Sequence, residues 1–121
     1  MAEHSSRVVA GPVSFVVDHR RVGGTGGPTV RVMGSDDHEY LKFDMFQVNA
    51  HYHYEPPGTD ERIVGIDTVA VGDAVEWVME RLRQRLAPML TEAGGGSLTD
   101  ALDDATLTDA IADVEALVRQ P

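Results

Sequence analysis

The sequence contains no cysteine. This absence excludes disulfides, iron–sulfur clusters, thiolate zinc sites and thiol nucleophiles. Long apolar runs are also lacking, because no stretch approaches the roughly 20 residues that a membrane-spanning helix requires. The first residues, Met1–Ser6, lack the basic and then apolar pattern of a secretory signal. We therefore expect a cytoplasmic protein that does not bind membranes.

Basic residues are scarce, with 10 Lys and Arg against 20 Asp and Glu and a formal net charge of -10. An acidic protein repels phosphate backbones, so we expect no binding to nucleic acid. Arg81, Arg83 and Arg85 alternate along a predicted helix, and we expect them to spread around it as a solvated surface. The partners left open are small molecules, metal ions and other protein chains, including a second copy of this chain.

The composition is otherwise that of a globular domain, with 121 residues of which 42% are hydrophobic and 25% are charged. We expect residues 1–96 to form a sheet-plus-helix core domain, in which residues 1–11 are a loose arm. Residues 97–121 are rich in acidic side chains. We expect them to form an acidic C-terminal helical element packed on the core or on a partner subunit.

Four segments have the residue pattern of strands, namely 13–17, 29–33, 39–55 and 62–69. The glycine-rich segment 22–28 lacks the spacing of a phosphate-binding loop and is interpreted as a flexible hairpin connection. A long helix is predicted to begin at Asp73, because apolar residues recur at helical spacing up to Ala93. The predicted fold class is α+β: a four-stranded antiparallel β-meander packed against a long α-helix, with a C-terminal helical element.

The segment 39–55 contains neither Gly nor Pro and is interpreted as one long strand. Its apolar residues stand at odd positions up to Met45 and at even positions from Phe46 to Tyr54. Because a strand turns alternate residues to opposite faces, we predict a β-bulge near Asp44–Phe46 that restores one apolar face. The opposite face then consists of polar side chains, which are Lys42, Gln47, Asn49, His51, His53 and Glu55.

His51 and His53 form the strongest candidate for chemistry. Residues two apart on a strand project to the same side about 7 Å apart, so two imidazoles can lean together onto one ion. Glu55 continues the row, and Asp67 of the predicted fourth strand is expected to face the pair. Two histidines with a carboxylate are the ligand set of open zinc sites and of non-haem iron sites. We therefore predict metal ligation by His51 and His53, with Asp67 or Glu55 as the third ligand, and zinc as the first choice of metal before iron or manganese.

Gln47 and Asn49 would extend this polar row and bind a ligand or orient a water molecule beside it. A bound ion would support hydrolysis, hydration, elimination or isomerisation, with His51, His53 and Asp67 as catalytic residues. Without a metal, one imidazole would act as a general base oriented by Asp67 in a small-molecule pocket. In a third interpretation the same face is the interface of a non-catalytic homodimer used for binding or interaction.

The His-x-His pair resembles the first metal motif of the cupins, in His51 and His53 alone. A cupin supplies its carboxylate several residues later and a further histidine downstream, whereas no histidine follows His53 in this chain. We therefore assign no cupin residues, and no family, from the sequence.

Overall fold

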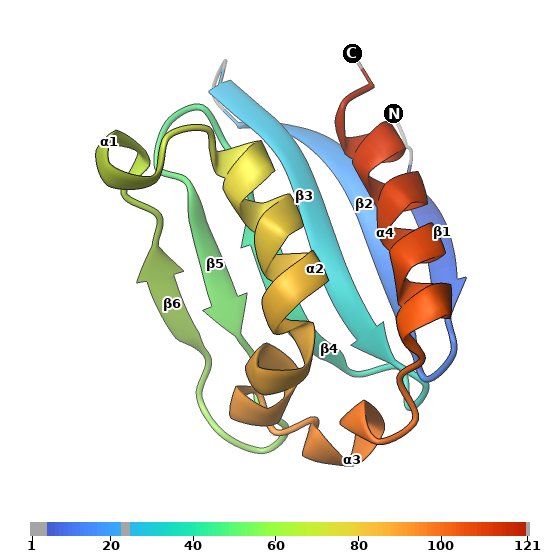
Figure 1. Ribbon diagram of the computed structural model, residues 1–121. Coiled ribbons are helices and arrows are strands. Elements are labelled where there is room, and N and C mark those ends of the chain that lie inside the picture. Colours follow the sequence, from blue (N-terminus) through green and yellow to red (C-terminus); the bar gives the residue numbers. More distant parts are fainter. Residues whose placement is uncertain (1–4, 23–24, 121) are drawn as a thin grey trace.

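The computed structural model describes residues 5–22 and 25–120. This part of the chain contains six strands in one antiparallel sheet, and each strand pairs with the next along the chain. Figure 1 shows the sheet as a twisted meander with its long helices on one side. The strands are β1 (Ser5–Ala10), β2 (Val13–Val22), β3 (Thr25–Gly34), β4 (Glu39–Asp44), β5 (His51–Tyr54) and β6 (Arg62–Gly65).

Two long helices cover one face of the sheet, with α4 (Asp104–Val118) over β1 and β2 and α2 (Ala74–Glu92) nearer β4 (Figure 1). Each begins at an aspartate whose side chain accepts a hydrogen bond from a backbone N–H of the first turn, Asp73 for α2 and Asp103 for α4. The short helices are α1 (Thr68–Val71) and α3 (Gly96–Thr99). Among the described residues, no helix is both long and apolar enough to cross a membrane.

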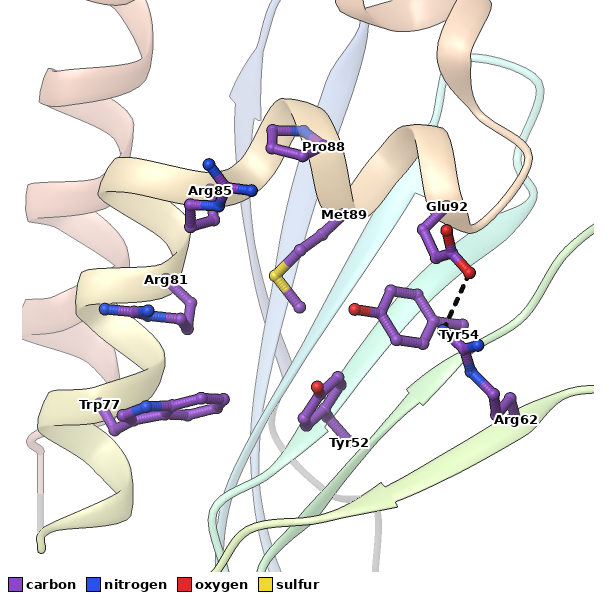
Figure 2. Close-up of a pocket in the computed structure, with 9 residues that line it drawn as sticks. All are labelled: Tyr52, Tyr54, Arg62, Trp77, Arg81, Arg85, Pro88, Met89 and Glu92. Atoms are coloured by element: carbon purple, nitrogen blue, oxygen red, sulfur yellow. Dashed lines mark hydrogen bonds and ion pairs between the residues drawn. The ribbon is translucent and has the colours of Figure 1, made fainter. Parts of the chain in front are cut away.

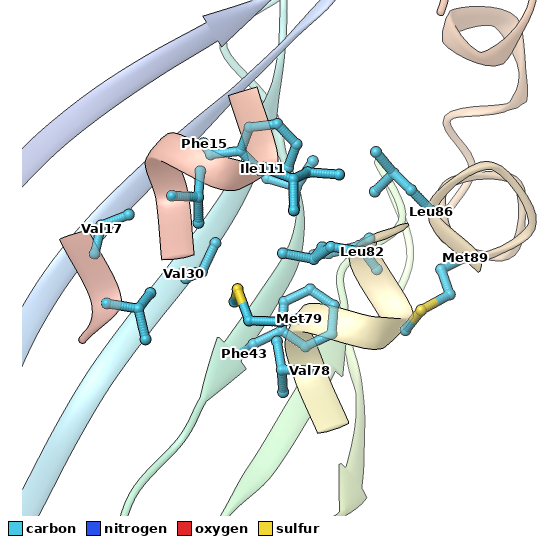
Figure 3. Packing of buried hydrophobic residues seen from close by; sticks show 14 of the residues in the cluster. Phe15, Val17, Val30, Phe43, Val78, Met79, Leu82, Leu86, Met89 and Ile111 are labelled. Carbon is cyan, nitrogen blue, oxygen red and sulfur yellow. The ribbon is translucent and has the colours of Figure 1, made fainter. Parts of the chain in front are cut away.

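The hydrophobic core lies between these two helices and the sheet, as Figure 3 shows. The apolar stripe of α2 packs there together with the alternate residues of the strands that point toward the helices. A core forms between a helix and a sheet when the helix has apolar residues along one side and the strands have apolar residues at alternate positions. Residues at most 2% exposed from both layers are Phe15, Val30, Phe43, Met79, Leu82 and Ile111.

The prediction of an α+β fold with an antiparallel sheet is confirmed, but the sheet has six strands and not four. We expected a loose arm at residues 1–11, but Ser5–Ala10 form β1, which pairs with β2 at the edge of the sheet. Residues 1–4 lie outside the described part. In the glycine-rich segment, Thr25–Gly27 extend β3, and Gly23 and Gly24 lie outside the described part. These segments escaped prediction because they hold few of the β-branched and aromatic residues that signal a strand, only Val8 and Val9 in the first and Thr25 in the second.

The segment 39–55 is a hairpin of β4 and β5, and not one strand with a bulge. The connecting loop contains Asn49 at a φ of 65°, a left-handed conformation that asparagine tolerates, so neither Gly nor Pro is needed. Opposed residues of a hairpin share a face, and here each pair joins an odd to an even number, such as Phe43 and Tyr52. The change of parity in the sequence therefore marks a hairpin, and both tyrosines of β5 lie on the helix side of the sheet.

Candidate metal centre

The face of the sheet turned away from the helices has polar side chains in register across three strands. Thr29 of β3 pairs with Asp44 of β4, and Asp44 pairs with His51 of β5. His53 stands two residues along the same strand and therefore points to the same side. Because directly opposed residues share a face, the register brings Asp44 between Thr29 and the two histidines.

Both histidines approach one oxygen of Asp44. The Nε2 atoms of His51 and His53 each lie 3.1 Å from Asp44 Oδ2, and the two ring centroids are 5.0 Å apart. The side chain of Asp44 is 3% exposed, that of His51 19% and that of His53 12%. The three groups therefore converge on one point that is near the surface but largely shielded from water.

Each imidazole is held from behind through its other nitrogen. The main-chain carbonyl oxygen of Asn49 lies 2.7 Å from Nδ1 of His51. Glu61 Oε2 lies 3.0 Å from Nδ1 of His53. A carbonyl and a carboxylate accept hydrogen bonds, so both contacts favour the tautomer in which Nδ1 carries the hydrogen.

A neutral imidazole that donates from Nδ1 presents a lone pair at Nε2. Two such lone pairs meet Oδ2 of Asp44, while Thr29 Oγ1 donates to the other oxygen, Oδ1, at 3.0 Å. Three electron-rich atoms in contact require positive charge between them, as protons on both rings or as one bound cation. Histidines whose second N–H binds a carbonyl or a carboxylate are typical of metal centres.

The spacing of these atoms fits a metal ion. Two ligand atoms about 2.1 Å from an ion lie about 3.0 Å apart at a right angle and about 3.4 Å apart at the tetrahedral angle that zinc prefers. The 3.1 Å between each Nε2 and Oδ2 lies between these two values. The three candidate ligand atoms all lie within 4.8 Å of one another. Asp44, His51 and His53 could therefore hold a metal ion. Gly65 pairs with His51, and a Cβ added there would meet no atom within 4 Å, so the surface beside the site is open.

The loop between β4 and β5 is fixed against β3 at a glycine. Met45 N–H donates to the Pro28 carbonyl at 2.9 Å, and Gln47 N–H donates to the Gly26 carbonyl at 3.1 Å. Between them, a Cβ on Gly27 would lie 2.5 Å from the Met45 carbonyl oxygen, and the φ of Gly27 is 156°. This close approach holds the chain directly after Asp44 and so supports the end of β4 where the site lies.

Asp67 lies apart from the two histidines, contrary to our expectation. β6 ends at Gly65, two residues before the aspartate. Asp67 is the N-cap of α1, where its side chain accepts hydrogen bonds from the backbone N–H groups of Val69 and Ala70 at 3.1 and 3.3 Å. Aspartate is a preferred N-cap residue, so a local helix start takes the carboxylate that the sequence pattern assigned to the site.

Glu55 lies outside the group of three as well. Burial, a hydrogen bond with Glu39 and the nearby charge of Glu61 raise the pKa of Glu55 to about 8. Its Oε2 atom is buried without a hydrogen-bond partner among the described residues. A metal ligand must be deprotonated, so a carboxyl group that keeps its proton near neutral pH is a poor ligand.

Gln47 and Asn49, expected as ligand-binding side chains, are both exposed residues of the loop between β4 and β5. The contacts described above use their main chains, the carbonyl of Asn49 toward His51 and the N–H of Gln47 toward Gly26. The interpretation of this row as a set of side-chain donors therefore does not describe how the loop supports the site.

Sequence reasoning missed Asp44, Thr29 and Glu61. Asp44 was assigned to a bulge, which left its side of the strand undefined. A signal for it was present in the sequence, because pairing Phe43 with Tyr52 in a hairpin places Asp44 opposite His51. No local pattern marks Thr29 or Glu61, because each reaches the site through tertiary structure, across a neighbouring strand or from a turn.

A family model described as "Domain of unknown function (DUF7700)" matches residues 7–118 of the chain. This span includes all the candidate ligands and the residues behind them. No curated protein and no solved structure matches the chain.

Proposed function

Since the chain belongs to a family described only as a domain of unknown function, DUF7700, we propose its function from the geometry of the site: Asp44, His51 and His53 bind one divalent transition-metal ion that acts as a Lewis acid. One observation supports this most strongly. Both Nε2 atoms point at the same Asp44 oxygen, while both Nδ1 atoms face acceptors. Such an arrangement favours a cation at the point of convergence.

The ligand types narrow the choice of metal. Two imidazole nitrogens and one carboxylate oxygen suit zinc, iron(II) and manganese, whereas calcium and magnesium prefer sites made of oxygen atoms. Zinc is our first choice, because two histidines and a carboxylate, with one position left for water, form its usual hydrolytic site. Iron(II) comes second, because the same three ligands on one side of an ion are typical of non-haem iron centres.

Three protein ligands leave part of the coordination sphere free for water or substrate. A metal ion in such a site lowers the pKa of its bound water or polarises a carbonyl oxygen. The open surface beside Gly65 gives a small molecule room to approach. We therefore propose a metal-dependent hydrolase, lyase or isomerase that acts on small molecules, with the face around His51 and His53 as its active site.

Metal content tests the first part of this proposal. Protein purified without a histidine tag, loaded with zinc and dialysed, is expected to retain one equivalent by elemental analysis. Asp44→Asn removes the shared carboxylate and should lose the metal. Asp67→Asn is the matched control, because it makes the same change of charge and asparagine also caps helices. Retention of zinc by Asp44→Asn, or equal loss in both variants, would contradict the proposal.

A cobalt-substituted protein tests whether the coordination sphere is open. Addition of azide should change the visible absorption spectrum of bound cobalt(II), because an exchangeable position accepts the anion. A cobalt spectrum that does not respond to azide would indicate a closed structural site, in which the metal stabilises the fold and has no catalytic role.

A homodimer formed through the same face is a second candidate function. The face is not covered by the long helices (Figure 1), and exposed apolar side chains lie near both of its edges, Val9 at 68% exposure and Ile63 at 58%. Pairing of Ile63 with His53 places it beside the proposed metal site. Sedimentation velocity distinguishes the metal site from the dimer interface. If the protein binds no metal and is a dimer, and Ile63→Gln is a monomer, the interface is favoured.

A further inference from the structure

A cleft lies between the sheet and α2, on the side of β5 opposite to the metal site. Its volume is about 370 Å³, and aromatic and arginine side chains form its walls (Figure 2). Small-molecule sites commonly have volumes of about 300–1,000 Å³. The alternation His51, Tyr52, His53, Tyr54 turns the histidines to one face of the sheet and the tyrosines into this cleft.

The aromatic rings of the cleft form one continuous wall. Tyr52 and Tyr54 have ring centroids 5.5 Å apart, and Tyr52 lies 5.8 Å from Trp77 of α2. Figure 2 shows the two tyrosines rising from the sheet toward the helix, with Trp77 facing them. Such a wall favours contact with a flat unsaturated molecule, because aromatic rings attract one another in offset or edge-to-face arrangements.

Three guanidinium groups stand at the edge of this wall. Two of them, Arg81 and Arg85, follow Trp77 at intervals of four residues. The side chains of Trp77, Arg81 and Arg85 therefore lie on one side of α2 (Figure 2). We expected Arg81, Arg83 and Arg85 to spread around the helix. Only Arg83 lies away from the other two, and it pairs with Glu115 of α4. Arg62 reaches the cleft from β6.

The guanidinium groups of two of these arginines lie over aromatic rings. The guanidinium carbon of Arg62 lies 4.5 Å from the ring centre of Tyr54, and that of Arg81 lies 5.3 Å from the ring centre of Trp77. Stacking on a ring fixes the plane of a guanidinium group and leaves the N–H groups at its edge free to bind. A fixed planar fork of donors matches the two oxygens of a carboxylate or phosphate.

The positive charge in the cleft is only partly neutralised. Arg62 is paired with Glu92 at 3.0 Å. Arg81 Nη2 pairs with Glu80 at 3.6 Å and donates to Gln84 Oε1 at 3.5 Å, whereas Arg81 Nε is buried without a hydrogen-bond partner among the described residues. Arg85 forms no ion pair within the described residues. In a chain with a formal net charge of -10, three arginines against the single carboxylate of Glu92 in the cleft lining are a local excess of positive charge.

We propose that this cleft is a ligand site, separate from the metal centre, that binds a small aromatic carboxylate. The acid group would lie against Arg81 and Arg85, and the ring would pack on Tyr52 and Trp77. Arg85 would then gain the ion pair that it lacks among the described residues. The volume of the cleft limits the ligand to a small molecule, and the acidic surface of the chain disfavours nucleic acid.

Trp77 reports directly on binding, because it is the only tryptophan in the chain. The single indole N–H resonance of ¹⁵N-labelled protein is followed during titration with benzoate. Benzyl alcohol is the neutral counterpart, and sodium chloride at the same ionic strength is the control for salt. We expect benzoate to shift the resonance saturably, and the affinity for benzyl alcohol to be at least about tenfold lower.

Variants of α2 localise the binding. Arg85→Gln should weaken benzoate binding by about tenfold, because it removes a charged donor from the cleft. Arg83→Gln loses the same charge from the same helix but outside the cleft, and its affinity should stay within about twofold. Asp44→Asn should bind benzoate like the original protein, so failure of the metal site and failure of this cleft are distinguishable. Equal affinities for benzoate and benzyl alcohol, or equal effects of Arg83→Gln and Arg85→Gln, would overturn the proposal.

Discussion

Asp44 is the residue on which the metal site depends, because its two oxygens have different tasks. Oδ1 accepts a hydrogen bond from Thr29, whereas Oδ2 faces both histidines. The carboxylate is nearly inaccessible to water, and a buried charge is stable only when its neighbours compensate it. Thr29 is fully buried behind it and fixes its orientation. Thr29 is thus a positioning residue for the proposed metal ligand.

Replacement of Thr29 by valine tests this role. Thr29→Val keeps the shape of the side chain but removes the donor to Asp44, so zinc affinity should fall by about tenfold. The free energy of unfolding should also fall, by about 1–3 kcal/mol, because a buried acceptor loses its partner. Competition with a chromophoric chelator measures the affinity. Thr91→Val, which changes an exposed hydroxyl on α2, should leave it unchanged, and an unchanged affinity in Thr29→Val would argue against the role.

Glu55 gives a prediction about pH, made for the metal-free protein. Its pKa is raised from 4.5 to about 8 by burial and by Glu39. A group whose pKa is higher in the folded state contributes stability that is complete below the pKa of the unfolded chain and is lost as pH rises through the folded value. The destabilising effect of Glu55 should therefore develop between pH 4.5 and about 8.

Urea unfolding of the original protein and of Glu55→Gln in this pH range measures the effect. The two proteins should have similar stabilities near pH 4.5, and Glu55→Gln should become progressively more stable than the original toward pH 8. The exposed substitution Glu80→Gln should produce no such divergence. A constant difference between Glu55→Gln and the original protein at all pH values would contradict the raised pKa.

At the scale of elements, the hairpin of β4 and β5 shows how far the sequence could be interpreted. Alternation along the segment 39–55 correctly placed both histidines on one face and both tyrosines on the other. It could not distinguish a bulge from a turn, because both invert the alternation and a turn without Gly or Pro has no strong signal. Asp44 was not predicted as a metal ligand because of this one ambiguity. Asp67 was misplaced for a related reason, because the end of a strand is poorly marked in sequence.

Gly27 couples the glycine-rich segment to this hairpin. An alanine there would place its Cβ against the Met45 carbonyl in a backbone conformation that favours glycine. Gly27→Ala is expected to lower the free energy of unfolding by about 1–3 kcal/mol. Gly65→Ala is the matched control, because its Cβ meets open space, and its effect should stay within about 0.5 kcal/mol. Equal stabilities of the two variants by chemical denaturation would show that the close approach is not required.

At the scale of the whole molecule, the sheet separates two chemical environments. One face contains the group formed by Asp44, His51 and His53, and the other contains the core together with the aromatic and arginine cleft. A metal ion bound to Asp44, His51 and His53 would link β4 to β5, the two paired strands of the hairpin. A metal ion bound there should therefore stabilise the folded chain as a whole.

Thermal unfolding tests this consequence. A ligand that binds only the folded state at a concentration of about 100 times its Kd adds about 2.7 kcal/mol of stability. For a domain of this size, zinc should then raise the Tm by several degrees. A chelator should reverse the shift, and the double variant His51→Ala/His53→Ala should not respond to zinc. An equal shift in that double variant would place the stabilising zinc elsewhere.

Anomalous diffraction at the zinc absorption edge, from crystals of the zinc-loaded protein, shows where the metal ion binds. We expect one strong peak between Asp44 Oδ2 and the Nε2 atoms of His51 and His53, at about 2.0–2.2 Å from each. A peak bound to other residues, or no peak at this position in protein that elemental analysis shows to contain zinc, would contradict this expectation.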